Sequence, residues 1–320
     1  MADARRGVVL LAGGVGGAKL AHGLQAHLGD RLTVVVNTAD DLERHGLLVM
    51  PDHDTVMYTL AGISNREWGW GIEGETFAAA EMLARYGEET WFRLGDRDLA
   101  THIVRTARIR AGGSLSRVSL ELQEALGVAA RIVPMSDDPV RTDVLTDDGW
   151  LEFQDYFVGR HQEPEVREVR FRGADLAGAA PGIVEAIGSA SAVVIAPSNP
   201  IVSLGPILAI SEIADAVAAA RAAGTPVVAV SGIVGGRALK GPADRMLSSL
   251  GHESSALGVG RLLAGVASDF VIDSVDGGLV ADIEALGLRV HVTDTIMADE
   301  PARARVAGEC LAIAGVAVPA

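Results

Sequence analysis

Short apolar runs rich in β-branched residues alternate with longer amphipathic segments rich in Ala and Leu along most of the chain. This alternation is typical of parallel strands joined by crossover helices. Several runs are apolar at every position, as expected of strands covered by helices on both faces. The pattern therefore predicts an α/β fold with a Rossmann-like, mostly parallel sheet and helices on both of its faces. We predict strands at residues 7–12, 32–37, 130–135, 192–197, 226–231, 269–274 and 289–294. We predict helices at residues 17–28, 54–62, 76–87, 98–111, 115–126, 179–188, 208–223, 279–286 and 299–314.

The stretch 140–172 departs from this rhythm. A turn signal at Asp148-Gly149 separates two strand-like runs, and "VREVRFRG" indicates a further strand after them. We therefore predict an antiparallel hairpin insertion or flap at 140–172. The rest of the chain, residues 1–139 and 173–320, would form the Rossmann-like core, which we expect to bind a nucleotide.

Composition limits the kinds of ligand that the chain can bind. Its 320 residues, 49% of them hydrophobic, can bury one large core. The formal net charge is −15, and the chain has no basic stripe that could exchange for counterions. We therefore expect no binding to nucleic acid or to an anionic membrane. A phosphate ligand would have to be held by local donors or by a metal ion.

The beginning of the chain, "MADARRGVVLLAGGVGGAKLA", places basic residues before an apolar run, as a signal peptide does. Lys19 and several glycines interrupt that run, so a buried first strand explains it better. No apolar stretch reaches the roughly 18 residues of a membrane helix. The single cysteine, Cys310, allows no internal disulfide and no cysteine-based zinc site. We expect a cytoplasmic protein.

The segment "LLAGGVGGAKL" (10–20) joins the first predicted strand to the first predicted helix and is interpreted as a glycine-rich loop. Such a loop lets backbone N–H groups approach a phosphate closely. It does not match the dinucleotide fingerprint, because Lys19 stands where the third glycine is needed. It does not match the P-loop either, because Ala18 and Leu20 replace the Gly before the lysine and the Ser or Thr after it. The alternative is a turn packed against the sheet without a ligand. The candidate contacts are Gly13, Gly14, Gly16, Gly17 and Lys19.

Acidic residues gather after the second predicted strand, in "NTADDLERHGLLVMPDHDT" (37–55). Asp40, Asp41, Asp52 and Asp54 would repel one another in a short loop unless a cation neutralised them, and carboxylate oxygens favour Mg²⁺. One alternative is a solvated acidic loop that caps the next helix. Another is that Asp40 holds a ribose hydroxyl of NAD. Beside a phosphate loop we favour the metal site.

Two further segments follow predicted strands or enter predicted helices. Arg93 or Arg97 could clamp a phosphate or stack on an aromatic ligand, whereas His102 fits a structural role better. Ser198 and Asn199, between two prolines, could contact a base or ribose, or could simply form a turn. All these motifs should meet at the carboxyl ends of the strands. No activated nucleophile is evident, which favours phosphoryl or nucleotidyl transfer.

Several motifs in series resemble one family. These are "GGVGGAKL", "VVVNTADD", "PDHDTVMYTLAG", "WFRLGDRDLATHI", "PMSDDPV", "FQDYFVG" and "APSNPIVSLGPIL". In order and spacing they resemble the CofD/FbiA family of the coenzyme F-420 pathway. The resemblance implies an Mg²⁺-dependent transferase of EC class 2.7.8. Such an enzyme moves phospholactate or phosphoenolpyruvate from a guanosine diphosphate adduct to the ribityl hydroxyl of the deazaflavin Fo. GMP leaves, and F-420-0 or dehydro-F-420-0 forms.

The resemblance also implies roles for individual residues. Asp40 and Asp54 match family positions near the metal, and we expect one of them to orient or deprotonate the Fo hydroxyl. Asp54 and Arg93 match positions that contact Fo, although the residue type at position 93 varies among relatives. The glycine segment would belong to the crevice that holds Fo and the guanosine phosphates. An apolar C-terminal half and the resemblance both favour a homodimer.

Two other functions are weighed against the transferase. A non-catalytic, nucleotide-sugar-binding regulator similar to the YvcK-type relatives would share the core, but those relatives usually have a Ser/Gly-rich continuation after the Asp pair. "DDLERHG" and "WFRLGDRD" favour the transferase instead. An NAD-dependent oxidoreductase is the weaker alternative, because the third glycine of the fingerprint is missing.

Overall fold

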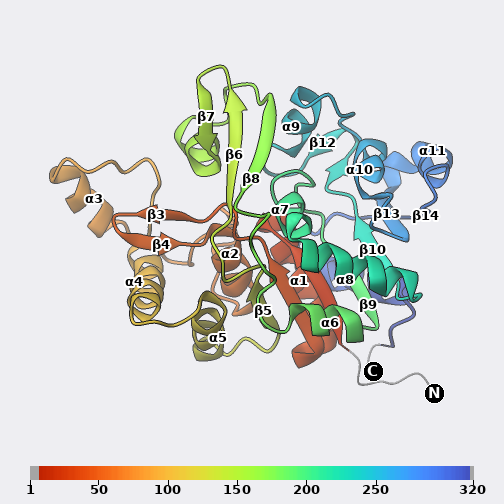
Figure 1. Cartoon of the computed structure of the whole chain (residues 1–320), viewed down its shortest axis with the longest axis horizontal. Coiled ribbons are helices and arrows are strands. Elements are labelled where there is room, and N and C mark those ends of the chain that lie inside the picture. The colour runs from red at the N-terminus through yellow and green to blue at the C-terminus, as the bar shows by residue number, and fades with distance from the viewer. Residues whose placement is uncertain (1–6, 318–320) are drawn as a thin grey trace.

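A seven-stranded parallel sheet forms the centre of the computed structural model, which describes residues 7–317 (Figure 1). Its strand order is β14-β13-β10-β9-β1-β2-β5. The chain therefore builds outward from β1 in one direction and then returns to build in the other. In such sheets ligands bind at the carboxyl ends of the strands where the order reverses, here β1 and β9. The strands are β1 (Val8–Ala12), β2 (Leu32–Val36), β5 (Arg131–Pro134), β9 (Ala192–Ile195), β10 (Val227–Val230), β13 (Asp269–Asp273) and β14 (Arg289–Thr293).

All seven strands predicted from the sequence are confirmed, and so is the fold class. These strands could be predicted from the sequence because most of them are buried along their whole length and consist largely of Val, Ile and Leu. The helices are α1 (Gly14–Leu28), α2 (Pro51–Leu60), α3 (Ala78–Arg85), α4 (Asp96–Arg110), α5 (Leu115–Ala125), α6 (Ile183–Ser189), α7 (Leu204–Ala209), α8 (Ser211–Ala222), α9 (Ala243–Ser249), α10 (Ala256–Leu263), α11 (Val280–Glu284) and α12 (Glu300–Ile313).

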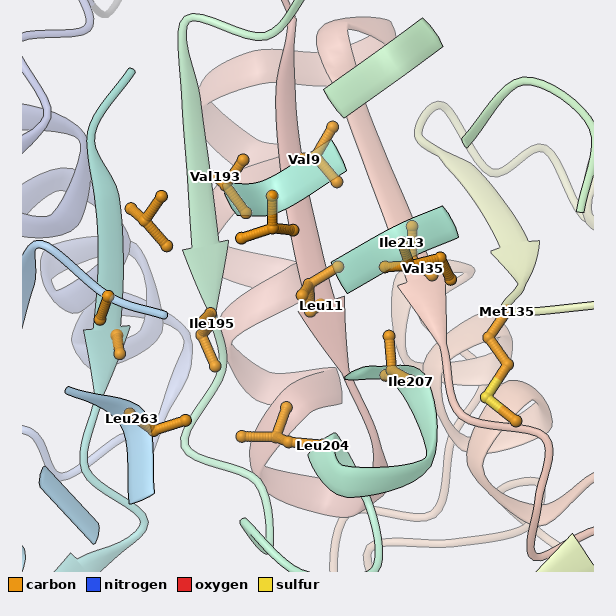
Figure 2. Close-up of a cluster of buried hydrophobic side chains, with 14 of the residues drawn as sticks. Val9, Leu11, Val35, Met135, Val193, Ile195, Leu204, Ile207, Ile213 and Leu263 are labelled. Carbon is orange, nitrogen blue, oxygen red and sulfur yellow. The ribbon is translucent and has the colours of Figure 1, made fainter. Parts of the chain in front are cut away.

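Helices cover both faces of the sheet, and alternate residues of each strand point to opposite faces. Val9 and Leu11 pack with α6, α7, α8 and α10, and Figure 2 shows their side chains beside Ile207 and Ile213. Val8 and Leu10 pack on the other face with α1, α2 and α12. Each of these fully buried side chains contributes roughly 1.5–3 kcal/mol. The two apolar layers fix the carboxyl edge of the sheet.

The insertion is a three-stranded antiparallel sheet at the top of Figure 1. It consists of β6 (Arg141–Thr146), β7 (Gly149–Glu152) and β8 (Glu168–Arg172), with β6 in the middle. Gly149 turns the predicted hairpin with φ of 97°, a conformation that glycine adopts at little cost. Phe153 and Tyr156 pack behind this sheet against Val202 and Met246 of the core. The division of the chain into two domains stays a prediction.

The structure differs from the predicted elements in several places. Helix α2 begins at Pro51 instead of residue 54, and α6 begins at Ile183 instead of residue 179. Helix α1 begins at Gly14 instead of residue 17. The helix predicted at 208–223 is two helices, because Ile210 is extended and buried in the core. The predicted acidic loop contains a hairpin of β3 (Leu42–Arg44) and β4 (Leu47–Val49). Helices α9 and α10, and the small hairpin of β11 (Ile233–Val234) and β12 (Arg237–Ala238), were not predicted.

Two expectations concern the ends of the chain and membranes. The basic residues of the signal-like start lie within 1–6, outside the described residues. Within residues 7–317, no helix is both long enough and apolar enough to cross a membrane.

Candidate active site

A cavity of about 740 Å³ opens at the carboxyl ends of the central strands. The start of α1, the start of α2 and the loop after β9 form its floor. Segments far away in sequence, around Trp68 to Arg93, Phe153 to Val158 and Lys240 to Ala243, complete the wall. The predicted convergence of motifs that follow strands therefore holds for this edge of the sheet. One part of the wall is acidic and another is aromatic.

The glycine segment is the first turn of α1, so its interpretation as a loop is wrong. A Cβ atom on Gly16 would come within 2.3 Å of the Pro197 carbonyl oxygen, and one on Gly17 within 2.9 Å of the Ala12 Cβ. The helix can approach the sheet this closely only with glycine at these positions. Gly13, Gly14 and Gly16 line the cavity, whereas Gly17 does not. Their contacts with a ligand stay predictions.

Asp40 and Asp52 share one hydrogen-bond donor. The Nδ2 of Asn37, just after β2, donates to Oδ2 of Asp40 at 2.9 Å and to Oδ2 of Asp52 at 3.1 Å. The other oxygen of Asp40, Oδ1, is buried near the Thr142 hydroxyl without a hydrogen bond of ordinary geometry. Burial and the nearby Asp52 charge raise the pKa of Asp40 well above its ordinary value.

Burial also raises the pKa values of two neighbouring carboxyl groups. Burial raises the pKa of Asp52 to about 6, although hydrogen bonds from Asn37 and the Gly14 backbone oppose the shift. Asp41 is buried with no hydrogen bond to its Oδ1, and burial raises its pKa as well. Asp41 does not line the cavity, whereas Asp40 and Asp52 do. Buried carboxylates of this kind become stable as anions when a cation joins them.

Asp54, in contrast, already has a cationic partner. The fully buried Arg105 of α4 donates from Nη1 to Oδ2 of Asp54 at 3.0 Å and from Nη2 to its Oδ1. Burial alone would raise the pKa of Asp54, but the Arg105 charge and the nearby His53 ring, with Nδ1 at 3.8 Å from Oδ1, hold it below the ordinary value. Next to this pair, Tyr58 donates to Oδ1 of Asp98 at 2.6 Å. Asp54 is thus kept ionised by the protein itself.

Two groups of side chains could accept a cation. Ligand atoms of Asp54, Asp98 and His102 lie within 4.8 Å of one another. Arg105 also approaches Nδ1 of His102, at 3.3 Å, so a guanidinium already neutralises that group. Among residues 7–317, neither Asp40 nor Asp52 forms an ion pair, and the charge of Arg141 is only the smallest influence on the pKa of Asp40. The unpaired oxygen of Asp40 and the oxygen-only donor set fit Mg²⁺.

Aromatic side chains dominate the outer part of the cavity. The chain has four Trp, three Tyr and six Phe residues, and eight of these side chains line this one cavity. Phe153 and Phe157 stack with ring centroids 5.3 Å apart, and Trp68 lies 5.3 Å from Trp70. Such a lining suits a flat aromatic ligand. The eight are Tyr58, Trp68, Trp70, Phe77, Trp91, Phe92, Phe153 and Phe157.

The predicted basic residues are divided between the cavity and its surroundings. Arg93 lines the cavity, with its guanidinium 4.0 Å from the centre of the Phe77 ring. Arg97 does not, and it donates to the Glu73 carbonyl. Lys19 lies on α1 outside the lining. Lys240, which sequence analysis did not select, does line the cavity.

Ser198 and Asn199 line the cavity but make local hydrogen bonds. The Ser198 hydroxyl donates to the Gly13 carbonyl at 2.8 Å and accepts from the Gly13 N–H at 3.1 Å. Oδ1 of Asn199 accepts from the N–H of Ile201 at 2.9 Å. These bonds are the turn chemistry that the sequence left as an alternative. They also connect the loop after β9 to the start of α1.

Comparison with known proteins adds an independent finding. The family model described as 2-phospho-L-lactate transferase CofD matches residues 8–295. A phosphoenolpyruvate transferase of Streptomyces griseus is 45% identical over 314 residues, which cover 96% of this chain and 98% of the relative. A 2-phospho-L-lactate transferase of Methanosarcina mazei is 40% identical over 291 residues, 91% of this chain and 94% of the relative.

The fold also occurs in a solved structure. The crystal structure of a member of the UPF0052 family from Bacillus halodurans superposes with a TM-score of 0.61. It covers 96% of this chain and 99% of its own, with 16% sequence identity. At that identity the likeness concerns the fold alone.

Proposed function

This chain belongs to the CofD family of phospho-acid transferases, and we propose that its acceptor is the deazaflavin Fo. The donor is a guanosine diphosphate adduct of a three-carbon acid, either phosphoenolpyruvate or 2-phospho-L-lactate. The terminal ribityl hydroxyl of Fo attacks the phosphorus next to the acid, and GMP leaves. The product is dehydro-F-420-0 or F-420-0, a reaction of EC class 2.7.8.

The observation that carries this proposal is the division of the cavity into an aromatic part and an acidic part. A deazaflavin is a flat, fused ring system, and the lining that includes Trp68, Phe77 and Trp91 offers it stacking surfaces. Arg93 stands over Phe77 at the edge of that lining. The acidic part, at the ends of β1 and β2, would then receive the ribityl chain and the phosphates.

Asp54 suits the task of orienting the attacking hydroxyl. Its carboxylate lines the cavity, and Arg105 keeps it ionised, so it can accept a hydrogen bond from that hydroxyl. The Ser198 hydroxyl, in contrast, is engaged by the Gly13 backbone. We therefore propose direct in-line attack on phosphorus without a covalent enzyme intermediate.

Mg²⁺ is part of the proposal. From the sequence we assigned it to Asp40 and Asp54. The under-paired oxygen of Asp40 supports the first assignment, and the engagement of Asp54 by Arg105 makes Asp52 the better second ligand. When bound, Mg²⁺ would supply charge stabilisation for the phosphate oxygens. A homodimer and a cytoplasmic location stay predictions, and light scattering tests the first.

The test is an end-point assay of the purified protein with Fo and each guanosine adduct, read by product mass. We expect F-420-0 from the phospholactyl adduct or dehydro-F-420-0 from the phosphoenolpyruvyl adduct, and GMP in equal amount. Excess EDTA should abolish the product, and added Mg²⁺ should restore it. Absence of product with both adducts would refute the proposed donor and acceptor, while undiminished product in EDTA would refute the metal alone.

A further inference from the structure

Lysine is rare in this chain, and its two occurrences lie close to each other. Of 27 basic Lys and Arg residues, Lys19 and Lys240 are the lysines and the other 25 are arginines. Although 221 positions apart in the sequence, they interact electrostatically, since the charge of Lys240 contributes to lowering the pKa of Lys19. Two ammonium groups have therefore been brought together beside one cavity in a protein of net charge −15.

Lys240 stands at the edge of the cavity. Its Nζ donates to the Trp68 carbonyl at 3.1 Å, which leaves two of its three donor positions for other partners. The same Nζ would lie 3.0 Å from a Cβ atom on Gly69, and the Val15 methyl groups lie at 3.3 and 3.4 Å from that point. Lys240 is thus next to the first turn of α1, where backbone N–H groups favour an anion.

Lys19 lies one turn further along the same face of α1 as Val15. It is half-buried, and among residues 7–317 its side chain has neither a hydrogen bond nor an ion pair. Burial, then Arg303, then Lys240 lower its pKa. Arg303 itself has a buried Nε without a hydrogen-bond partner. The charges of Glu300 and Asp299 act on Arg303, but among residues 7–317 neither lysine forms an ion pair. In a chain with 42 acidic residues, two neighbouring lysines without an acidic partner favour an anionic ligand.

The other charged residues that line the cavity make most of its wall unfavourable for an anionic ligand. Four carboxyl groups, those of Asp40, Asp52, Asp54 and Asp98, line the inner wall, and Arg93 is placed over an aromatic ring. A free diphosphate would be repelled by the inner wall unless a metal bridged it. Near Lys240 the diphosphate would meet an ammonium whose hydrogen-bond partner is a backbone carbonyl and not a carboxylate. The first turn of α1 lies next to this ammonium, although its Gly14 N–H already donates to Asp52.

We infer that Lys240 binds the diphosphate of the donor at this edge of the cavity, with Lys19 strengthening the positive field behind it. The inference rests on the proposed function and assigns the phosphates of the guanosine adduct to the α1 side of the cavity, next to the part of the aromatic lining that contains Trp68. An ammonium suits this task because it is a compact charge with three donors that can follow a phosphate as it moves. Lys240 is then a specificity-determining residue for a diphosphate-bearing donor.

Calorimetric binding of GDP, guanosine and inorganic pyrophosphate tests the inference without turnover. Lys240→Met should weaken GDP and pyrophosphate binding about tenfold or more, and Lys19→Met about threefold, with guanosine and Fo binding unchanged. Higher salt should reduce these differences, because the interaction is between charges. Arg237→Met is the matched control, since Arg237 is exposed on the neighbouring β12 and does not line the cavity. It should bind all four ligands as the wild type does.

The outcomes separate this inference from the proposed function. Equal GDP affinity in wild type and Lys240→Met overturns the inference, and so does an equal loss of guanosine and GDP binding, which would mean a changed cavity shape. Wild-type protein that binds neither GDP nor pyrophosphate also overturns it. Lysine-dependent binding of pyrophosphate in a protein that yields no product with Fo supports the lysine site and refutes the transfer reaction. Normal turnover with an unchanged donor KM in Lys240→Met supports the transfer reaction and refutes the lysine site.

Discussion

Asp269 and Asp40 are buried carboxylates at opposite edges of the same parallel sheet. Asp269 begins β13 at the amino edge, where Arg289 donates to both of its oxygens, at 2.8 and 2.7 Å. Burial alone would raise the pKa of Asp269, but hydrogen bonds from Arg289, His291 and Ser268 hold it at about 2. Asp40 follows β2 at the carboxyl edge, with one donor, Asn37, and a raised pKa.

The different hydrogen bonding of Asp269 and Asp40 indicates different roles for the two edges of the sheet. At the amino edge the protein completes the hydrogen bonding of a buried carboxylate, which favours a stable fold. At the carboxyl edge it leaves one oxygen of Asp40 without a hydrogen bond and places the Asp52 carboxyl group beside it, a cost that is usual where a ligand or an ion completes the site. Asp54 is an informative exception, because it lies at the carboxyl edge yet is paired with Arg105. The edge alone therefore does not decide a carboxylate's role; its partners do.

The largest expected effect comes from breaking the paired carboxylate inside the site. Arg105→Met would leave the buried Asp54 without its cation, and the free energy of unfolding should fall by about 3–5 kcal/mol. Urea denaturation measures this loss. The double variant Asp54→Asn/Arg105→Met is the control, and it should recover much of the stability because no unpaired charge is left. A loss below about 1 kcal/mol in Arg105→Met would contradict the assignment of Asp54 as a paired group.

The sequence predicted the sheet well and the contacts of the site poorly. Runs such as Val34–Val36 are buried and β-branched, so local pattern and tertiary environment agree. The glycines of α1 misled the prediction because glycine is a poor helix former, and only the close approach to Pro197 explains its use. The helix start was therefore placed three residues late.

Long-range pairs explain most of what was missed in the site. Arg105 and Asp54 are 51 residues apart, and Tyr58 and Asp98 are 40 apart, so no spacing rule connects them. The aromatic lining had a weak signal, in that Trp68 and Trp70 stand close together in a chain with few aromatics. No feature of the sequence indicated the role of Asn37, because a single Asn after a strand is common in ordinary turns.

The next largest effect is expected at Asp40, which has one oxygen without a hydrogen bond, and it should lower the catalytic activity. Asp40→Asn should lower kcat about 100-fold, equivalent to about 2.7 kcal/mol in the barrier, because the metal and phosphates lose a charge partner. Stability without Mg²⁺ should be equal to or above that of the wild type, since a neutral amide is less costly to bury. Asp41→Asn is the matched control: it removes another buried, under-paired carboxylate that does not line the cavity. If Asp41→Asn lost as much activity, charge near β2 in general, and not Asp40, would be responsible.

The opposite result is expected at the amino edge. Asp269→Asn should cost about 1.5–3 kcal/mol of unfolding free energy, typical of hydrogen bonds to a charged group, and leave the KM for Fo unchanged. Because the folded pKa of Asp269 lies near 2, below the ordinary 3.8, the unfolded state binds more protons at low pH. The stabilisation is therefore complete above about pH 4 and is lost as the pH falls toward 2. Acid unfolding curves of wild type and variant should converge over that range, and parallel curves would contradict the assignment.

The smallest expected effect comes from Asp52. Its contribution to the free energy of unfolding should depend on pH in the opposite direction to that of Asp269. The folded pKa of Asp52, raised to about 6, exceeds the ordinary 3.8, so the folded state retains its proton when the unfolded state has lost it. The stability is full below about pH 4 and declines as the pH rises through 6. Since Asp52 is partly exposed to the cavity, we expect a decline of about 1 kcal/mol.

Thermal or urea unfolding in EDTA between pH 4 and 8 measures this decline. Asp52→Asn should flatten the curve relative to the wild type, because the amide keeps an oxygen for the Asn37 and Gly14 donors but has no proton to lose. Asp269→Asn, measured in parallel, should shift the whole curve downward without changing its slope above pH 5. Added Mg²⁺ should raise wild-type stability most at the alkaline end, where both Asp52 and Asp40 are closest to ionisation and a cation gains most from joining them. A slope that is the same in wild type and Asp52→Asn would show that hydrogen bonds from Asn37 and Gly14 already satisfy Asp52, and the contrast with Asp269 would then rest on Asp40 alone.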